Sequence, residues 1–183
     1  MQPSDLELIQ ASREGDQNAF RQLVVRHEPI VRSTVLGMLG NAPETEEVAQ
    51  DVFVRFYRSM DQFQGNAKLG TYLTRIAINL SLNAIKARQR RQNRFAPWKD
   101  SVQEPMGNDH GKQLEWRELL QWAMGQLVED QRTVAVLRLV DGYPLKEIAQ
   151  ILDIPIGTVA SRLQRAQDKL RALLAPYRIE NKL

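Results

Sequence analysis

The sequence has no cysteine, and histidine occurs only twice. The lack of cysteine excludes disulfides, thiolate metal sites and cysteine nucleophiles, and it fits a reducing compartment. His27 falls in a predicted helix and His110 in a predicted linker, and we expect both at the surface. No histidine or carboxylate cluster has the spacing of a metal site, and no nucleophile motif occurs. These absences predict a protein that is not an enzyme and that uses no cofactor and no metal.

Long apolar runs are also missing. No stretch approaches the ~20 apolar residues that a membrane span needs. The first ten residues, MQPSDLELIQ, have neither the basic nor the apolar segment of a secretory signal. We therefore expect no membrane insertion and a cytoplasmic location. The hydrophobic content of 43% and the charged content of 26% instead predict a globular chain with one ordinary or two small domains.

Acidic residues are absent from one long segment. Between Gln62 and Trp98 there are seven basic side chains and no acidic one. Residues 143–183 carry a net charge of +3, whereas residues 1–61 and 99–142 carry −4 and −3. Two separate basic blocks are expected of a protein that binds a polyanion at two places. Solvated helix faces are the ordinary alternative, but both basic blocks coincide with the motifs described next.

Periodicity predicts helices almost everywhere and no β-hairpin, so the fold class should be all-α. Ser4 and Glu7 have the spacing of a capping box at the first helix. Pro29 should kink or interrupt the second helix near its middle. Periodicity then fails from Gln92 to about Gln113, where two prolines and two glycines occur. We predict two small helical domains joined by a flexible linker, with the domains at 1–94 and 114–183 and the linker at 95–113.

The C-terminal stretch YPLKEIAQILDIPIGTVASRLQRAQDKL has the spacing of a helix-turn-helix. Asp153 occupies the turn position that favours glycine, and aspartate tolerates a positive φ better than most residues. The outer face of the second helix carries hydroxyl, amide and guanidinium groups that suit a major groove. A plain helical hairpin with a solvated face is the alternative. The predicted DNA contacts are Thr158, Ser161, Arg162, Gln164 and Arg165.

Two stretches together resemble a known family. EEVAQDVFVRFYRSMDQFQGNAKLGTYLTRIAINLSLNAIKARQRR resembles the second conserved region of bacterial sigma factors, and LVEDQRTVAVLRLVDGYPLKEIAQILDIPIGTVASRLQRAQDKLRALL resembles the fourth. They stand in the family's order with a short linker and no third region between them, as in the extracytoplasmic-function (ECF) group. The resemblance covers about Asp5 to Leu174. It implies a region 2 helical bundle followed by a region 4 helix-turn-helix.

The resemblance also implies partners and roles. Such a factor binds core RNA polymerase through the clamp and flap of its large subunits, recognises the minus-ten and minus-thirty-five elements of promoter DNA, and promotes promoter melting. An anti-sigma factor is a further candidate partner. AQDVFVRFYR matches the segment that docks on the polymerase clamp. The resemblance therefore implies that Gln50, Asp51, Phe53 and Arg55 contact the polymerase.

DQFQGNAKLGTYLTRIAIN matches the family's segment that captures the unpaired minus-ten strand. The extruded-base pocket maps onto Phe63 and the loop from Gln64 to Gly70, with Asn79 behind it. An unstacked base needs an aromatic wall with amide or backbone partners, and these residues supply such groups. Core packing is the alternative for Phe63, and helix capping or bridging for Asn79. The pocket is predicted to include Gln64, Gly65, Asn66, Ala67 and Lys68, and the phosphate track Lys68, Arg75, Lys86, Arg88, Arg90, Arg91 and Arg94.

The sequence departs from the family pattern at several positions. Tyr72 replaces a usual Trp, and Val128 replaces a usual proline. Pro144 replaces a Ser or Thr helix cap, a loss of about 1 kcal/mol. Ala160 stands where many members have a basic side chain that contacts the minus-thirty-five element. The alternative function is a two-domain regulator that binds duplex DNA through its helix-turn-helix without polymerase, but such a protein has no use for the loop and basic helix of residues 62–94.

Overall fold

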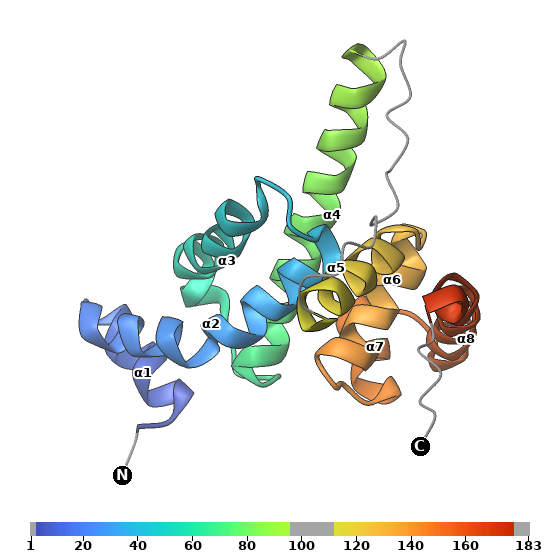
Figure 1. The fold of residues 1–183 in the computed structure, drawn as a ribbon. Helices are drawn as coiled ribbons and strands as arrows, with labels where there is room; N and C mark the ends of the chain where they lie inside the picture. Colours follow the sequence, from blue (N-terminus) through green and yellow to red (C-terminus); the bar gives the residue numbers. More distant parts are fainter. Residues whose placement is uncertain (1–2, 96–111, 178–183) are drawn as a thin grey trace.

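The computed structural model describes residues 3–95 and 112–177, and every regular element within these ranges is helical (Figure 1). The predicted all-α class is confirmed. We call residues 3–95 the N-terminal unit and residues 112–177 the C-terminal unit. Most of the predicted linker lies outside the described residues, as do His110 and the side chain of Arg94.

Four helices and one short turn build the N-terminal unit, and four helices and two short turns build the C-terminal unit. The first unit contains α1 (Asp5–Arg13), α2 (Gln17–Leu39), α3 (Thr45–Ser59), η1 (Met60–Gln62) and α4 (Leu69–Phe95). The second contains α5 (Lys112–Gly125), α6 (Glu129–Ala135), the π-helical turn η2 (Val136–Val140), α7 (Leu145–Leu152), α8 (Ile156–Leu174) and η3 (Ala175–Tyr177).

A local signal in the sequence explains how α1 begins, and exposure to solvent explains how α2 continues through a proline. Ser4 and Glu7 form the predicted capping box: the Ser4 N–H donates to Glu7 Oε2 at 2.6 Å, and the Glu7 N–H donates to Ser4 Oγ at 3.3 Å. The interruption considered at Pro29 does not occur, because α2 is one helix through that residue. Proline leaves the carbonyl of Val25 without its helical donor. Val25 is 64% exposed, so this turn of α2 faces solvent.

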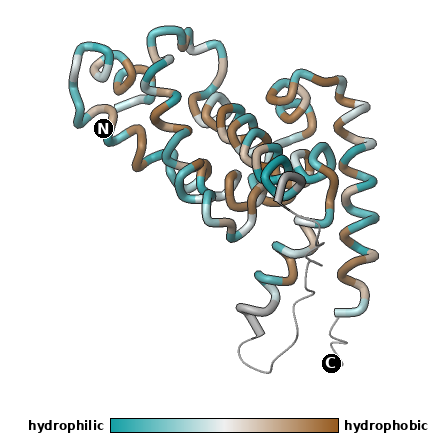
Figure 2. The backbone as a smooth tube through the Cα atoms, turned by 90° about the horizontal axis from the view of Figure 1, so that it is seen from above, coloured by the Kyte–Doolittle hydropathy of each residue, from teal (hydrophilic) through white to brown (hydrophobic). Residues whose placement is uncertain are grey.

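One apolar core runs through both units. In the N-terminal unit the rings of Phe56, Phe63 and Tyr72 pack edge to face, with centroids between 5.1 and 6.2 Å apart. Val136 and Ile148 are fully buried and extend the same core into the C-terminal unit. Apolar and polar residues alternate along the helices (Figure 2), as amphipathic helices around a shared core require. Among the described helices, none is both long enough and apolar enough to cross a membrane.

The helix-turn-helix is formed by α7 and α8. Asp153 ends α7 in the left-handed region, at φ 53° and ψ 49°, as the sequence predicted. Pro144 begins α7 without a side-chain cap, also as predicted. Val159, Leu163 and Ala166 form the buried stripe of α8. This packing leaves the opposite face of α8 directed away from the core.

The two units pack directly against each other along α2 and α4. A Cβ atom built on Gly37 would lie 2.9 Å from Val136 Cγ2, so the backbone of α2 approaches η2 as closely as glycine allows. Arg132 of α6 donates to the Met38 carbonyl at the end of α2, at 3.0 Å. The same guanidinium donates to the Leu127 carbonyl, also at 3.0 Å. Arg132 therefore connects the end of α2 to the turn between α5 and α6.

Candidate nucleic-acid interface

The predicted base pocket lies between η1 and α4. Phe63 is only 7% exposed and belongs to the core, but it also lines a cavity of about 620 Å³ with Gly65, Asn66, Ala67 and Lys68. Core packing and pocket lining therefore both hold for this ring. Gly65 has a φ of +74°, which favours glycine and shapes the turn of the loop. Gln64 is exposed, does not line the cavity, and accepts a hydrogen bond from the Asn66 amide at 3.2 Å.

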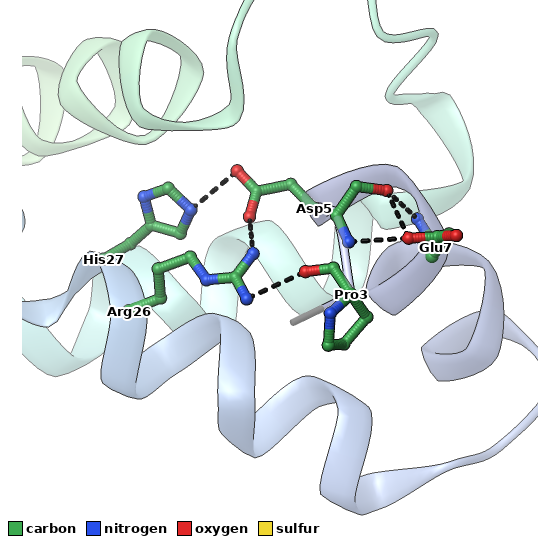
Figure 3. Close-up of polar contacts among 6 residues, drawn as sticks. Pro3, Asp5, Glu7, Arg26 and His27 are labelled. Carbon is green, nitrogen blue, oxygen red and sulfur yellow. Dashed lines mark hydrogen bonds and ion pairs between the residues drawn. The ribbon is translucent and has the colours of Figure 1, made fainter. Parts of the chain in front are cut away.

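The structure adds residues from α1 and α2 to the wall of this cavity. His27 Nε2 lies 2.9 Å from Asp5 Oδ2, and Arg26 donates to Asp5 Oδ1 at 2.6 Å and to the Pro3 carbonyl at 2.9 Å (Figure 3). The prediction that His27 lies at the surface was wrong: its side chain is 12% exposed, because α1 folds back over α2. Its Nδ1 would lie 3.6 Å from a Cβ on Gly70.

A second arginine holds the start of the loop. Arg13 at the end of α1 donates to the Met60 carbonyl at 2.6 Å and to the Phe63 carbonyl at 2.7 Å. These contacts fix η1 and the entry to the cavity. Neither Arg13 nor His27 had a motif signal in the sequence, because their partners are brought together only by the packing of α1.

The predicted minus-ten residues on α4 do not share one surface. Lys86, Arg90 and Arg91 are exposed on the C-terminal half of the helix, where they form a basic track. Arg88 lies beside them but pairs with Glu44, with Nη2 2.7 Å from Oε1. These four residues are brought together as predicted, although one of them already has an acidic partner.

Arg75 and Asn79 lie on a different part of α4. The Arg75 Nε donates to the Ile151 carbonyl at 2.8 Å, and its Nη2 donates to the Gln150 carbonyl at 3.1 Å. Asn79 is exposed and lines a separate cleft of about 230 Å³ with Arg75 and Arg162, away from the loop cavity. The structure therefore does not bring Asn79 to the pocket of Phe63.

The predicted polymerase-docking segment lies on α3. Gln50, Asp51 and Arg55 are exposed on one face of this helix. Phe53 is 8% exposed and packs into the core, so it supports that face from beneath. Val54 is 45% exposed on the outside of the same helix. Sequence periodicity did not single out this exposed apolar residue.

The predicted minus-thirty-five residues lie on α8. Ser161, Gln164 and Arg165 are exposed, and Thr158 is partly exposed near the start of the helix. The side chain of Arg162 is 27% exposed, and its Nη2 lies 2.5 Å from Asp130 Oδ2 of α6. This arrangement presents hydroxyl, amide and guanidinium groups on one helix face, which suits base edges and phosphates in a major groove.

Two titratable side chains of the C-terminal unit, Asp141 and Tyr143, form hydrogen bonds with the N-terminal unit. Asp141 accepts hydrogen bonds from Ser33 at 3.0 Å and from Thr34 at 2.8 Å. Burial raises the pKa of Asp141, and the two hydroxyl donors oppose that rise. Tyr143 shares a hydrogen bond with Thr74 at 3.0 Å, and burial raises the pKa of this phenol as well.

Similarity to known proteins covers both units. Residues 23–91 match the family described as Sigma-70 region 2, and residues 117–170 match Sigma-70, region 4. The chain is 33% identical over 178 residues to the ECF RNA polymerase sigma factor SigW of Bacillus subtilis, over 91% of this chain and 94% of the relative. It is 30% identical over 185 residues to the RNA polymerase sigma-H factor of Pseudomonas aeruginosa, over 96% of each chain. The fold resembles that of CnrH, solved in complex with the cytosolic domain of CnrY, with a TM-score of 0.69 and 26% identity over 94% of this chain and 97% of the other.

Proposed function

This chain belongs to the ECF RNA polymerase sigma factors, and from this premise we propose that it binds core RNA polymerase, directs it to promoters through minus-thirty-five and minus-ten contacts, and promotes melting. Sigma factors are a class of transcription factors without enzymatic activity, and we propose that this chain likewise catalyses no reaction and needs no cofactor. It would work in the cytoplasm, where the polymerase is. The observation that carries the proposal is the occurrence of regions 2 and 4 in family order, each on its own helical unit.

We assign the functions to three parts of the chain. Residues 1–94 act as the region 2 domain, which docks on polymerase and captures the minus-ten strand. Residues 114–183 act as the region 4 domain, which reads the minus-thirty-five element, and residues 95–113 join them. The docking face is the outer side of α3, with Gln50, Asp51 and Arg55 in contact with the clamp and Phe53 supporting them. The exposed side chain of Val54 would add an apolar contact to that face.

The loop cavity supports capture of an unstacked base. A base entering it would meet the Phe63 ring, the Asn66 amide and the backbone of the loop, which are the partners that single-stranded recognition uses. Arg13 and the Asp5–His27 pair would hold the wall of the cavity in place. The strand that leaves the cavity would then pass the basic track of α4. Binding only the unpaired strand would stabilise the melted state.

The face of α8 supports duplex recognition. Arg165 and Gln164 have the groups that bind guanine and adenine edges, and Ser161 can reach a phosphate. CnrH was solved with a protein partner, and we propose that this chain is likewise regulated by an anti-sigma factor. That partner would have to cover the α3 face or the DNA-binding faces in order to inhibit.

Run-off transcription with purified core polymerase tests the proposed function. The templates are genomic fragments upstream of transcripts that rise when the protein is overproduced. We expect transcripts that start at one position only when the chain is added. If the chain instead binds these duplexes without core polymerase and yields no specific transcript, the duplex-binding regulator is the better assignment.

A further inference from the structure

The wall that α1 and α2 add to the loop cavity carries a side chain that can distinguish one base from another. We propose that His27 Nδ1 accepts a hydrogen bond from the exocyclic amine of the captured base, so that the cavity favours adenine, cytosine or guanine over thymine. Thymine is the one DNA base without an exocyclic amine. The inference rests on the proposed function, because it names the class of base that the proposed minus-ten pocket selects.

The hydrogen bond on one side of the imidazole determines what the other side offers. His27 Nε2 lies 2.9 Å from Asp5 Oδ2, and an ionised carboxylate can only accept hydrogen bonds. Nε2 therefore carries the proton, and in the neutral ring Nδ1 is left as an acceptor. Arg26 donates to the other carboxylate oxygen, Asp5 Oδ1, at 2.6 Å. This bond fixes the carboxylate, and the carboxylate in turn fixes the orientation and the tautomer of the ring.

Nδ1 lies on the side of the His27 ring that is turned away from Asp5 (Figure 3), and it is accessible. Within the part of the chain that the structure describes, it has no hydrogen-bond partner, and it is not among the buried polar atoms without one. Outside its own helix and chain neighbours, a Cβ built on Gly70 would meet only Nδ1 and Cε1 of His27, at 3.6 and 3.8 Å. Glycine therefore leaves the approach to Nδ1 open, and both residues line the loop cavity.

Other groups on the cavity wall complement an acceptor at Nδ1. The Asn66 amide and the Lys68 ammonium can donate to ring nitrogens or carbonyl oxygens of a base. An exocyclic amine projects from the base and can enter the space beside Gly70. The ring N–H of thymine instead stands between two carbonyl oxygens, whose lone pairs would face Nδ1. A thymine in the cavity would therefore leave Nδ1 without a donor, which costs binding energy.

Two carboxylates on the same wall are competing acceptors for an amine. Asp5 already uses both of its oxygens, one for Arg26 and one for His27. Glu147 of α7 also lines the cavity, and its carboxylate is the alternative acceptor. Glu147→Ala removes that acceptor and leaves His27 in place, so this variant distinguishes the two assignments.

The experiment measures promoter binding by the full chain assembled with core polymerase, at about pH 8, where an ordinary imidazole is neutral. The probe is a labelled promoter duplex from the run-off assay whose minus-ten segment is already melted by mismatches. An abasic site is placed at each non-template position of that segment in turn, and the position of greatest loss holds the captured base. There we compare adenine with purine, cytosine with the pyrimidinone that lacks its amine, and guanine with hypoxanthine. Removing the amine should weaken binding by the wild type about tenfold, and thymine should bind as weakly as the amine-free analogues.

Two variants of His27 separate recognition of the base from a structural role. His27→Gln places an amide nitrogen near the position of Nε2, which keeps a donor for Asp5 and removes Nδ1. His27→Asn places an amide carbonyl near the position of Nδ1 and gives up the bond to Asp5. We expect His27→Gln to bind bases with and without the amine alike, and His27→Asn to keep part of the preference. The opposite order would mean that His27 only holds the wall in place, and it would overturn the inference.

Gly70→Ala tests the approach to Nδ1 with His27 intact. The added methyl group would lie 3.6 Å from Nδ1, an ordinary contact that the fold accepts, but it would obstruct the amine and lower the preference. Gln22→Ala, at an exposed position of α2, is the matched control and should change nothing. A wild type that prefers thymine, or a preference lost in Glu147→Ala but kept in His27→Gln, overturns the inference. Specific run-off transcription without any amine preference overturns this inference alone, whereas no specific transcript overturns the proposed function as well.

Discussion

Replacing Gly37 by alanine should destabilise the folded molecule, although alanine is the better helix former. Gly37 lies inside α2, where alanine gains about 1 kcal/mol of helix propensity over glycine. The new Cβ, however, would lie 2.9 Å from Val136 Cγ2 and 3.0 Å from Val136 Cγ1. Ordinary carbon contacts are about 3.5–4.0 Å, and such overpacking costs about 1–3 kcal/mol. Because valine is stiff at χ1, we expect a net loss of up to about 2 kcal/mol in the free energy of unfolding.

The second half of this prediction concerns Val136→Ala, which removes both clashing methyl groups. Alone, it should cost about 1.6 kcal/mol for two buried methyl groups, plus a cavity contribution. Combined with Gly37→Ala, the new methyl group partly fills that space and the clash disappears. The double variant should therefore be more stable than the sum of the single effects predicts, by about 1–3 kcal/mol.

Urea unfolding of the full chain and its three variants, followed by circular dichroism, measures this coupling. Gly157→Ala is the matched control, because nothing lies within 4 Å of a Cβ at that position in α8. It should be neutral or slightly stabilising. If Gly37→Ala stabilises by about 1 kcal/mol and adds to Val136→Ala within about 0.5 kcal/mol, then the two residues do not touch and the packing of the units is refuted.

Three further predictions concern the proposed DNA-binding residues and the carboxyl group of Asp141. Asn66→Ala should slow strand opening, seen by permanganate footprinting, while affinity for core polymerase is unchanged; an equal loss of both would argue against a base-capture role. Arg165→Ala should weaken binding by roughly 1–3 kcal/mol at one base pair of the minus-thirty-five element in competition assays, whereas a uniform loss across sequences would indicate a phosphate contact. Burial raises the pKa of Asp141 above the ordinary 3.8, so its protonated form is favoured in the folded chain, and its contribution to stability is greatest at low pH. The unfolding free energy of the wild type relative to Asp141→Asn should accordingly fall as pH rises through that raised pKa, and a pH-independent difference would contradict this.

Phe63 is a poor target for testing the pocket by truncation. Its ring packs against Phe56 and Tyr72 in the core, and removing such a ring costs about 3–5 kcal/mol in stability. Loss of DNA binding by Phe63→Ala would therefore not separate a pocket role from unfolding. Asn66 is exposed in the loop and lines the same cavity, so its truncation tests recognition with little effect on the core.

The extent of sequence-based prediction followed the range of the interactions. The capping box of Ser4 and Glu7 was predicted because both partners lie within one turn. Asp153 in the left-handed turn was predicted for the same reason, since the spacing of the two flanking helices specifies that position. His27 was misjudged because its partner Asp5 is 22 positions away and meets it only when α1 folds onto α2.

The basic segment at residues 62–98 illustrates both levels. Its composition and spacing were sufficient to predict a helix, a glycine-containing loop and a positive surface, because local backbone preferences and net charge are properties of the chain itself. Tertiary packing decided which of those charges are available. Packing leaves Lys86, Arg90 and Arg91 exposed, pairs Arg88 with Glu44, and places Arg75 against the end of α7. Arg88 and Glu44 are 44 positions apart in the sequence, and Arg75 and its partner on α7 are 76 positions apart. No local rule of the sequence predicts such pairs.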